Sequence, residues 1–371
     1  MKILLVNWQD RENPLAGGAE LHLHEIFGRL AARGHVVDLY CSGWPGAARR
    51  TALDGMRVMR RGGRHSWALL GRSTIRQALR HHAYDVVVED VNKIPLFTAG
   101  LSDLPSYVIV PHLFGTSAFG EASWPVAAAV WLLERPLPAA YRRSAFHAIS
   151  HATADDLVAR GVARERIRVI HPGVDTTWYS PDDVVDRPPH PSFLYVGRLK
   201  RYKGVDTAVR ALAALRADVP DATLDVAGAG DDRDRLERLV YTLGLENAVH
   251  FHGFVDEEAK RRLLRHTWAN IFPLLKEGWG MTNLEAAACG TPSLAADTSA
   301  LRESVRDGET GFLVPYGDVP ALAGSMRRLA TDRTLVERLG RAARAFAADF
   351  TWNRTADQTE QHLAETVQGA E

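Results

Sequence analysis

Short apolar segments alternate with longer amphipathic segments along nearly the whole chain. Several of the short segments are apolar at every position, which is typical of strands in a sheet that is covered on both faces. The longer segments repeat their apolar residues with helical spacing, and some of them stop at a glycine, such as Gly34 or Gly161. Alternation of this kind predicts an α/β fold with parallel, doubly wound sheets.

The alternation predicts two series of elements, one in each half of the chain. The expected strands of the first half are 3–6, 36–40, 57–59, 85–88, 107–110 and 145–149, and the expected helices are 19–33, 66–82, 124–143 and 153–160. The expected strands of the second half are 193–196, 224–227, 249–251, 269–273, 293–295 and 311–314, and the expected helices are 205–217, 232–243, 257–266, 281–289, 318–331 and 333–348.

A proline-rich interruption separates the two series. Residues 171–192 contain five prolines and little periodicity, which predicts a linker between two Rossmann-like domains over 1–170 and 193–350. The last segment, 351–371, is one more helix than the second domain needs. Two such sheets would face each other across a cleft at the carboxyl ends of their strands, where ligands bind in open α/β sheets.

Composition excludes several classes of protein. The formal net charge is zero, so no overall field favours a nucleic-acid partner. Cys41 and Cys289 are far apart and unpatterned, which argues against a disulfide framework or a zinc site and favours a cytoplasmic location. The first residues predict a strand rather than a signal peptide, and the longest apolar run, 124–133, is about half the length of a membrane span.

An arginine-rich stretch offers one alternative to a fully soluble protein. Nine arginines and a single acid, Asp54, lie between Arg49 and Arg80. Together with the tryptophans of 124–131 they could touch the inner face of a membrane that carries anionic lipid. The competing interpretation is a solvated arginine face beside a core helix.

Two glutamates bracket a helix start that follows a buried strand. Glu277 comes at the carboxyl end of this strand, and Gly278 and Gly280 let the backbone approach a ligand closely. A helix that begins near Met281 would favour an anion at its first N–H groups. Glu285, one turn into that helix, can point to the same side, and each carboxylate suits sugar hydroxyls better than phosphate.

A basic loop follows the first strand of the second half. Arg198 lies just beyond that strand, and Lys203 precedes Gly204 and the next helix. Two cations on one loop can share the charge of a diphosphate, and their grip would strengthen as charge develops on a leaving group. Lys200 and Arg201 are expected to stay solvated.

Weaker signals lie at other strand ends. Gly17 and Gly18 precede a helix and could form a phosphate or sugar pocket, although their spacing is not that of a dinucleotide fingerprint. His112 closes strand 107–110 and could bind a sugar hydroxyl, and Gly253 and Phe254 follow another strand and could line a nucleoside pocket. The alternatives are that the glycine segments are ordinary turns and that His112 is a surface or core histidine without a role in binding. We see no nucleophile set and no aspartate or histidine motif for a metal.

Together these segments resemble the retaining glycosyltransferases of GT-B architecture, in particular family 4. Glu277–Glu285 and the following Ala-Ala-Ala-Cys-Gly-Thr-Pro resemble the E-x7-E signature of that family, and 197–204 resembles its diphosphate-binding loop. Matches to its other motifs follow in order along the chain, at 17–20, 169–175, 307–314 and 350–352. One departure is His171-Pro172, where relatives often have Pro-Asn.

The resemblance implies a reaction and a set of roles on the donor side. The enzyme would transfer a hexosyl group from a nucleotide sugar to a hydroxyl with retention of configuration, by front-face substitution and without a metal or other cofactor. Arg198 and Lys203 would bind the diphosphate, and Glu277 would hold the donor sugar. The remaining donor contacts would come from Gly253 and Phe254 at the base, Gly280, Met281 and Thr282 at the sugar and distal phosphate, and Glu285 at the ribose.

The resemblance also implies roles for the first domain. His112 and the Gly17–Gly18 loop would lie on the acceptor side, bordering the reacting sugar of the donor. The final helix, within 351–371, would cross back onto this domain. Trp279, where relatives carry other aromatic residues, would alter the fit of the sugar.

Two other classes of protein stay open at this point. A two-domain sugar-binding protein could close over its ligand without chemistry, although a neutral sugar needs no pair of cations. A nucleotide-sugar epimerase or a phosphorylase could share the architecture, and a phosphorylase usually has a longer chain and a cofactor lysine. The sequence does not specify the nucleobase, the sugar, the acceptor, the linkage or the oligomeric state.

Overall fold

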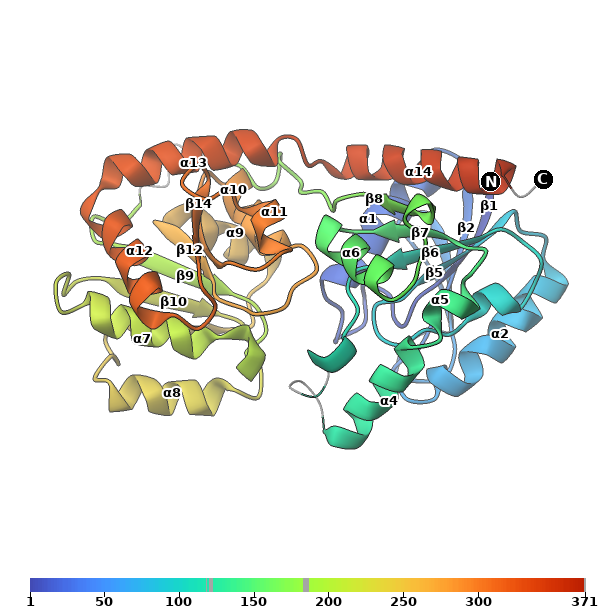
Figure 1. The fold of residues 1–371 in the computed structure, drawn as a ribbon, viewed down its shortest axis with the longest axis horizontal. Helices are drawn as coiled ribbons and strands as arrows, with labels where there is room; N and C mark the ends of the chain where they lie inside the picture. The colour runs from blue at the N-terminus through green and yellow to red at the C-terminus, as the bar shows by residue number, and fades with distance from the viewer. Residues whose placement is uncertain (118, 120–122, 183–186, 370–371) are drawn as a thin grey trace. The chain divides into compact units, whose positions relative to one another are not determined.

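The computed structural model describes residues 1–117, 119, 123–182 and 187–369. The chain forms two compact units: unit 1 comprises Met1–Gly173 and Trp352–Glu371, and unit 2 comprises Val174–Thr351 (Figure 1). It therefore passes into unit 2 after Gly173 and returns to unit 1 after Thr351. Residues 183–186 of the expected linker and residues 370–371 of the expected last helix lie outside the described residues.

Unit 1 is built on an eight-stranded sheet with the order β3-β4-β2-β1-β5-β6-β7-β8. Every neighbouring pair is parallel except β3 and β4, which form an antiparallel hairpin. The strands are β1 (Lys2–Val6), β2 (Val36–Cys41), β3 (Arg50–Leu53), β4 (Met56–Arg60), β5 (Val86–Asp90), β6 (Ser106–Val110), β7 (Ala145–Ala148) and β8 (Ile167–Val169).

Helices cover both faces of this sheet. They are α1 (Gly18–Ala32), α2 (Trp67–His81), α4 (Trp124–Glu134), α5 (Leu137–Ala140), α6 (His151–Ala159) and α14 (Trp352–Gln368). Strand β1 shows the two-sided burial, because consecutive strand residues point to opposite faces. Ile3 and Leu5 pack in one core with residues of α1 and α14, whereas Leu4 and Val6 pack in another with residues of α2.

Unit 2 is built on a six-stranded sheet that is parallel throughout, with the order β11-β10-β9-β12-β13-β14. Its strands are β9 (Ser192–Val196), β10 (Thr223–Ala227), β11 (Val249–Gly253), β12 (Ala269–Phe272), β13 (Ser293–Ala296) and β14 (Gly311–Val314). Its helices are α7 (Val205–Leu215), α8 (Arg233–Thr242), α9 (Glu257–His266), α10 (Met281–Ala288), α11 (Leu301–Ser304), α12 (Val319–Thr331) and α13 (Arg333–Ala347).

The central strand of unit 2 repeats the two-sided pattern. Phe193 and Tyr195 of β9 pack in a core with residues of α7, α8 and α12, and Leu194 and Val196 pack in a second core with residues of α9, α10 and α13. The unbroken apolar run of this strand is therefore required by burial on both sides.

The structure corrects some of the predicted boundaries. The single helix expected over 124–143 is wrong: α4 ends at Glu134 and a separate short helix, α5, begins at Leu137. Pro136 and Pro138 explain the break, because proline cannot continue the hydrogen-bond ladder of a helix interior. Strands β3 and β8 and helix α11 were not predicted.

Part of the expected linker belongs to the core of unit 2. Val174 pairs with Thr351 in an isolated bridge, and Val174 and Tyr179 are both buried in the core that holds α10 and α13. Arg344 of α13 donates hydrogen bonds to the carbonyl oxygens of Thr176 and Tyr179 at 3.1 and 2.9 Å. Residues 174–179 are thus held in place despite their lack of periodicity.

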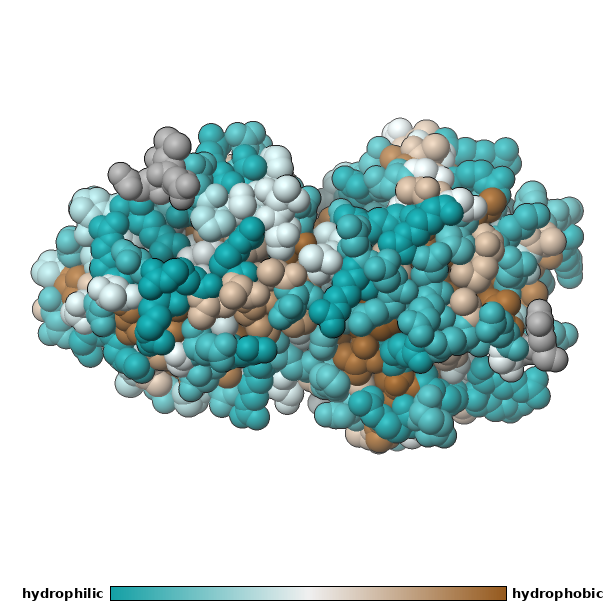
Figure 2. Space-filling model, turned by 90° about the horizontal axis from the view of Figure 1, so that it is seen from above, coloured by the Kyte–Doolittle hydropathy of each residue, from teal (hydrophilic) through white to brown (hydrophobic). Residues whose placement is uncertain are grey.

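The surface in the view of Figure 2 is mostly hydrophilic, with apolar residues gathered in smaller groups. Among the described helices, none combines the length and the apolar character that crossing a bilayer requires. The exposed apolar residues include Trp124, Val126 and Leu132 of α4.

Candidate active site

The order of strands in unit 2 places one pair of loops at a special position. From β9 the chain proceeds to β10 and β11 on one side, whereas β12, β13 and β14 lie on the other side. The carboxyl ends of the neighbouring strands β9 and β12 therefore flank the point where the winding direction reverses. Ligands bind at such a switch point in open α/β sheets, because the two loops separate there.

The loop after β9 carries the two predicted cations. The hydroxyl of the buried Tyr195 donates a hydrogen bond to the carbonyl oxygen of Arg198 at 3.1 Å, which fixes the start of the loop. Lys203 ends a short 3-10 helix, and the next residue, Gly204, has a φ of +69°. A side chain at Gly204 would place its Cβ 2.3 Å from the carbonyl oxygen of Pro273, so glycine is needed where this loop meets the loop after β12.

Lys203 and Glu277 form an ion pair across these two loops. The ammonium Nζ of Lys203 lies 2.9 Å from Oε2 of Glu277, and both side chains are largely buried. Burial alone lowers the pKa of Lys203, but the charge of Glu277 outweighs it and holds that pKa above its usual value. The structure therefore brings the predicted diphosphate-binding lysine and the predicted sugar-binding carboxylate together at the switch point.

Arg198, by contrast, is exposed at the start of the same loop. Its guanidinium is thus accessible to an anion, while the loop backbone beneath it is fixed. Lys200 pairs with the exposed carboxylate of Asp231 at 2.7 Å, and Arg201 is exposed. These two positions agree with the expectation of a solvated basic turn.

The helix α10 begins at the predicted glycine. Gly280 has a φ of +90°, and a Cβ there would lie 2.9 Å from Cδ2 of Leu301 and 3.0 Å from Oγ of Ser304. Beneath it, the buried Asn283 accepts a hydrogen bond from Asn270 at 2.9 Å and donates one to Ser304 at 3.3 Å. This network fixes the first turn of α10, whose leading N–H groups lack partners within the helix and can bind an anion.

Met281 and Thr282 occupy the first two positions of α10 and are half-buried. Trp279 lies just before this turn, but it is buried and packs on Phe350, with ring centroids 5.4 Å apart. The expected influence of Trp279 on the sugar is therefore indirect, through the packing under the loop.

Glu285 has a partner that the sequence analysis did not identify. Its Oε1 lies 3.0 Å from Nζ of Lys260 in α9, and the same ammonium lies 2.9 Å from Oε1 of Glu257. The carboxylate is buried, and the Lys260 ammonium also lies 5.3 Å from the ring of Tyr179. Burial lowers the pKa of Lys260, but Glu285 and Glu257 outweigh it and raise that pKa above its usual value.

Both predicted glutamates are thus paired with a lysine. The ammonium lies 2.9 Å from Glu277 in one pair and 3.0 Å from Glu285 in the other. The candidate site of unit 2 is therefore suited to an anionic group near Arg198 and the start of α10, and to hydroxyl groups near the carboxylates.

Close backbone contacts join the neighbouring loops of this edge. A Cβ at Gly228 would lie 1.9 Å from the carbonyl oxygen of Gly197, and a Cβ at Gly230 would lie 2.0 Å from that of Leu199. The N–H of Gly228 donates to the carbonyl oxygen of Gly253 at 2.7 Å. Next to it, the side chain of Phe254 is 85% exposed, which leaves its ring available for stacking.

The predicted residues of unit 1 lie at the corresponding edge of its own sheet. The winding direction reverses between β1 and β5, and Gly17 and Gly18 are exposed at the end of the loop after β1. The N–H of Gly17 donates to Oε2 of Glu20 at 2.8 Å. His112 follows β6, is half-buried, and contacts Phe114 edge-on with ring centroids 4.8 Å apart.

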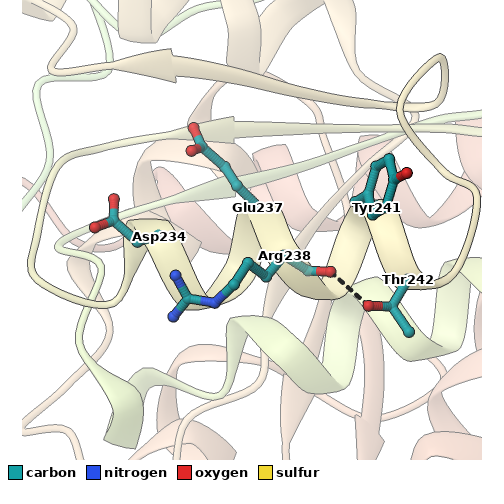
Figure 3. Close-up of a pocket in the computed structure, with 5 residues that line it drawn as sticks. All are labelled: Asp234, Glu237, Arg238, Tyr241 and Thr242. Atoms are coloured by element: carbon teal, nitrogen blue, oxygen red, sulfur yellow. Dashed lines mark hydrogen bonds between the residues drawn. The ribbon is translucent and has the colours of Figure 1, made fainter.

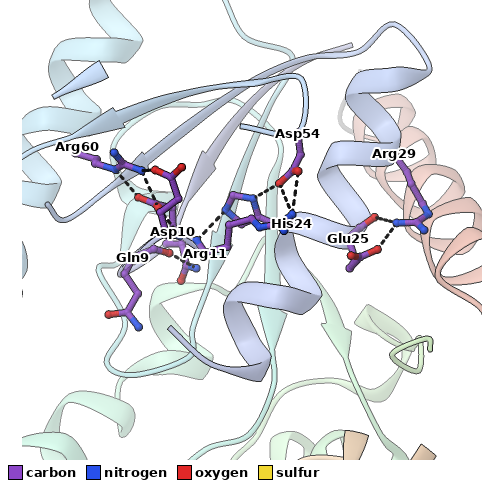
Figure 4. A network of polar contacts seen from close by, with 10 residues as sticks. Gln9, Asp10, Arg11, His24, Glu25, Arg29, Asp54 and Arg60 are labelled. Atoms are coloured by element: carbon purple, nitrogen blue, oxygen red, sulfur yellow. Dashed lines mark hydrogen bonds and ion pairs between the residues drawn. The ribbon is translucent and has the colours of Figure 1, made fainter. Parts of the chain in front are cut away.

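A buried ion pair holds the loop after β1 (Figure 4). Asp10 accepts two hydrogen bonds from the guanidinium of Arg60, at 2.7 and 2.9 Å, and both side chains are almost fully buried. Nearby, Asp54 in the β3–β4 turn accepts hydrogen bonds from Arg11 at 2.9 Å and pairs with His24 at 2.7 Å. The Asp54–Gly55 turn was the only sequence signal that could have indicated this hairpin.

A surface hollow elsewhere in unit 2 does not belong to this site. It is lined by Asp234, Glu237, Arg238, Tyr241 and Thr242, all from one side of α8 (Figure 3). It contains no residue from the ends of the strands, so we give it no role in binding.

Two family models match the two halves of the chain. The model described as "Glycosyltransferase Family 4" matches residues 16–178, and the model described as "Glycosyl transferases group 1" matches residues 183–346. The second range contains every predicted donor-site residue of unit 2, and the first contains Gly17, Gly18 and His112.

Whole-chain relatives agree with these matches. The chain is 30% identical to a glycogen synthase of Mycobacterium tuberculosis, over 97% of this chain and 94% of the relative. Among solved structures, it resembles a sucrose-phosphate synthase from Thermosynechococcus elongatus, with a TM-score of 0.83, 23% identity and full coverage of both chains. It also resembles HepE from Anabaena in complex with UDP-glucose, with a TM-score of 0.78 and 21% identity over 98% of this chain and 100% of that one.

The structural likenesses establish the GT-B architecture, with two parallel-sheet α/β domains. The glycogen synthase relationship spans almost the whole chain and exceeds what the fold alone would explain. The chain belongs to the glycosyltransferases of family 4 and group 1.

Proposed function

We propose that this enzyme transfers a hexosyl group from a nucleoside-diphosphate sugar to a hydroxyl acceptor, with retention of configuration and without a metal. The Lys203–Glu277 ion pair at the switch point of unit 2 is the observation that carries this proposal. A nucleotide sugar has a phosphate next to a sugar, and here the ammonium of Lys203, which could bind the phosphate, is in direct contact with the carboxylate of Glu277, which could bind the sugar hydroxyls.

The diphosphate of the donor would bind between the loop after β9 and the start of α10. Arg198 is exposed and suits bidentate contact with phosphate oxygens, while Lys203 acts as a point charge. The N–H groups of Met281 and Thr282 add the favourable end of the helix dipole. Together these groups would balance the negative charge of the diphosphate, which a divalent cation balances in other transferases.

We propose the following chemical step at this site. The bond between the anomeric carbon and the diphosphate oxygen breaks, and a bond to the acceptor oxygen forms on the same face of the sugar. The acceptor proton passes to an oxygen of the departing diphosphate. Arg198 and Lys203 bind that diphosphate more strongly as its charge grows, which lowers the barrier.

Glu277 would orient the sugar rather than attack it. Its carboxylate is engaged by Lys203, whereas a retaining glycosidase uses a second carboxylate as the nucleophile. Glu285 would hold the ribose, Phe254 would stack on the base, and Gly253 would let the base approach the backbone. In unit 1, Gly17, Gly18 and His112 would bind the acceptor and the reacting sugar.

The relatives support the choice of donor. HepE is described in complex with UDP-glucose, and glycogen synthase and sucrose-phosphate synthase name sugar-transfer products. We therefore expect a nucleotide-activated hexose here, with the nucleobase to be determined.

A thermal-shift panel tests the donor site. Purified protein is heated with UDP, GDP, ADP or TDP and with the corresponding hexose nucleotides, because a ligand that binds only the folded state raises the melting temperature. We expect one nucleotide family to raise it, and Lys203→Ala to abolish that rise while Lys200→Ala retains it. A protein that no nucleotide stabilises would not be a nucleotide-sugar transferase.

Product analysis then separates transfer from the other two classes. A transferase consumes the stabilising nucleotide sugar and releases a nucleoside diphosphate with retained anomeric configuration in the product. An epimerase would convert the sugar while keeping it on the nucleotide or releasing it as an epimer. A binding protein would leave the donor intact.

We also propose a cytoplasmic enzyme that touches the membrane surface through unit 1. The side chain of Trp124 is 73% exposed, and Val126 and Leu132 of the same apolar helix are exposed as well. Arg142 and Arg143 are exposed shortly after this helix and would favour anionic lipid. Sedimentation with vesicles of phosphatidylglycerol tests this contact, and binding that is equal for Trp124→Ser and the wild-type protein would contradict it.

A further inference from the structure

The last residue of β5 is an aspartate at the switch point of the unit 1 sheet. β5 lies between β1 and β6, and the winding direction reverses between β1 and β5. Val86 and Val88 of β5 pack in the core with α1, whereas Val87 packs in the core with α2. Because strand residues alternate between faces, Asp90 points to the face that α1 covers, and Glu89 points to the other.

The two adjacent carboxylates have opposite environments. Glu89 accepts hydrogen bonds from the N–H of Leu96 at 2.5 Å and from the N–H and hydroxyl of Thr98 at 2.9 and 2.5 Å. Asp90 is only 2% exposed, and within the described part of the chain neither of its oxygens has a hydrogen-bond partner. Glu89 therefore anchors the loop after β5, while no structural task in the fold accounts for Asp90.

A buried carboxyl group without a partner is rare and unfavourable. Burial of an unsatisfied polar group costs free energy, and natural proteins keep such groups chiefly where function needs them. Burial first, and then the nearby charge of Glu20, raise the pKa of Asp90 well above its usual value. This shift favours the protonated form, in which a carboxyl group offers one O–H donor and one acceptor.

The residues around Asp90 leave a further oxygen unused. Glu20, at the start of α1, accepts hydrogen bonds from the N–H of Gly17 at 2.8 Å and from Nδ2 of Asn92 at 3.0 Å. These contacts tie the loop after β1 to the loop after β5. The other end of the Asn92 amide, Oδ1, is buried and has no partner among the described residues.

We propose that Asp90 and Asn92 form a subsite for the hydroxyl groups of an uncharged polyol portion of the acceptor. This inference rests on the proposed sugar transfer and specifies the chemical class of its acceptor. Both oxygens of Asp90 and Oδ1 of Asn92 are buried without a hydrogen-bond partner among the described residues, and adjacent hydroxyl groups can both donate to and accept from such atoms. The exposed Gly17–Gly18 segment lies next to this cluster and marks the side from which a ligand would reach it.

A phosphate is a poor match for the same group of atoms. It would place its own oxygens against three buried oxygens and its negative charge near the carboxylate of Glu20, although Lys93 supplies one positive charge nearby. The subsite should therefore select hydroxyls and reject a phosphoryl group at the position that it contacts. A buried water molecule that bridges Asp90 and Asn92 is the competing explanation, and it would leave acceptor kinetics independent of Asp90.

The test compares Asp90→Leu and Asp90→Asn with the exposed control Asp103→Asn in the full-length protein. Glycerol, myo-inositol and maltotriose are offered as acceptors, each beside a phosphorylated counterpart, with the nucleotide sugar that stabilises the wild-type protein. Nucleoside diphosphate release is measured with each acceptor, and donor hydrolysis is measured without one.

We expect an uncharged polyol to be glycosylated in preference to its phosphate. Asp90→Leu should raise the KM for that polyol at least tenfold while donor hydrolysis and the melting temperature are kept or increased. Asp90→Asn, which retains a neutral donor and acceptor, should recover part of the affinity and serves as the folded variant if Asp90→Leu does not fold. Asp103→Asn should match the wild-type protein.

Three results would overturn the inference: preference for the phosphorylated acceptors, glycosylation of none of the three polyols, or a KM within twofold of wild type in the folded Asp90 variants. The last result would assign Asp90 to a buried water. Failure of the wild-type protein to hydrolyse any nucleotide sugar would instead count against the proposed function, so the two failures are distinguishable.

Discussion

The ammonium of Lys203 lies 2.9 Å from a carboxylate oxygen of Glu277, although 74 residues separate them in sequence. One residue follows β9 and the other follows β12, and these strands are neighbours in the sheet. The pair is therefore a product of sheet order, and it fixes two side chains of opposite charge before any ligand binds. Such preorganisation reduces the reorganisation that the reaction would otherwise require.

Removal of either partner should abolish most of the transfer activity. We expect Lys203→Ala and Glu277→Ala each to lower kcat/KM at least a hundredfold, or about 3 kcal/mol, because each breaks the ion pair and removes one ligand contact. Nucleoside diphosphate release measures the effect, and circular dichroism checks the fold. Lys200→Ala, which breaks only an exposed pair with Asp231, should stay within about twofold of wild type.

The double variant Lys203→Ala/Glu277→Ala gives a sharper comparison. Because the two residues act as a unit, its loss should be much smaller than the sum of the two single losses. Strictly additive losses would show that the ion pair has no role in the reaction.

The glycine between Lys203 and α7 should be required for the geometry of that pair. Gly204 and Gly244 have nearly equal φ values, +69° and +66°, but only at Gly204 would a Cβ meet a neighbour, the carbonyl oxygen of Pro273 at 2.3 Å. Both Gly→Ala variants should lose about 1 kcal/mol of unfolding free energy, because alanine disfavours the left-handed backbone conformation. Gly204→Ala should lose at least ~2 kcal/mol more because of the clash with Pro273. Urea denaturation measures the two free energies of unfolding, and equal losses would show that the loop after β12 can move to accommodate the added methyl group.

The architecture and the cation loop were predictable because both follow from local patterns. Strand Ser192–Val196 is apolar at most positions because helices cover both faces, and the glycines and cations come directly after it. An accurate strand boundary then places Arg198 and Lys203 at the carboxyl edge without further information. The family resemblance supplied their proposed roles.

Contacts between elements distant in sequence could not be predicted in this way. Lys260 contacts Glu285 only because α9 and α10 pack on the same face of the sheet. The periodicity of a helix predicts its apolar face but does not identify the helix that lies next to it. Asp90 lies beyond the predicted strand 85–88 and received no role, since the sequence does not show that its neighbours leave it without a hydrogen-bond partner. Tyr179 lies among prolines and was assigned to a linker, although burial, rather than periodicity, determines its position.

The buried Asp10–Arg60 pair should be among the most sensitive polar contacts of unit 1. Burial raises the pKa of Asp10, but hydrogen bonds from Arg60, from Cys41 and from the N–H of Glu12, together with the charge of Arg60, outweigh it and hold that pKa below its usual value. Arg60→Met would leave the buried carboxylate of Asp10 without its counter-ion, although Cys41 and the N–H of Glu12 would still donate to it, and we expect a loss of about 3–5 kcal/mol in unfolding free energy. Calorimetry measures it, with Arg302→Met as the control.

Arg302 forms a comparable pair with Asp297, but its side chain is exposed. Its replacement should therefore cost much less stability than that of Arg60. In the variant Asp10→Asn/Arg60→Met the buried negative charge is removed as well, and Glu12, which loses its ion-pair partner, is half-exposed, so part of the stability should return. Equal stability of Arg60→Met and Arg302→Met would contradict the structural importance of the buried pair.

Buried histidines beneath α14 should make unit 1 sensitive to mild acid. Burial lowers the pKa of His22 to about 4 from its usual 6.5, and burial likewise lowers the pKa of His362 to about 4. His22 lies 5.5 Å from the ring of His147 and 6.0 Å from that of Trp352, the first residue of α14, so a charge there would face another imidazole and an apolar ring.

The direction of the pH effect follows from these values. Between pH 6.5 and about pH 4 these histidines are protonated in the unfolded chain but stay neutral in the folded one. The stability of the fold is therefore fully present above pH 6.5 and falls as the pH decreases through this window. For His22 alone we expect a loss of roughly 1.5 kcal/mol between pH 6.5 and about pH 5. His22→Leu removes the titrating group from a site where neither ring nitrogen has a partner among the described residues, and it should reduce this dependence. Thermal unfolding at several pH values measures it, and an unchanged slope in His22→Leu would show that His22 does not drive the acid sensitivity.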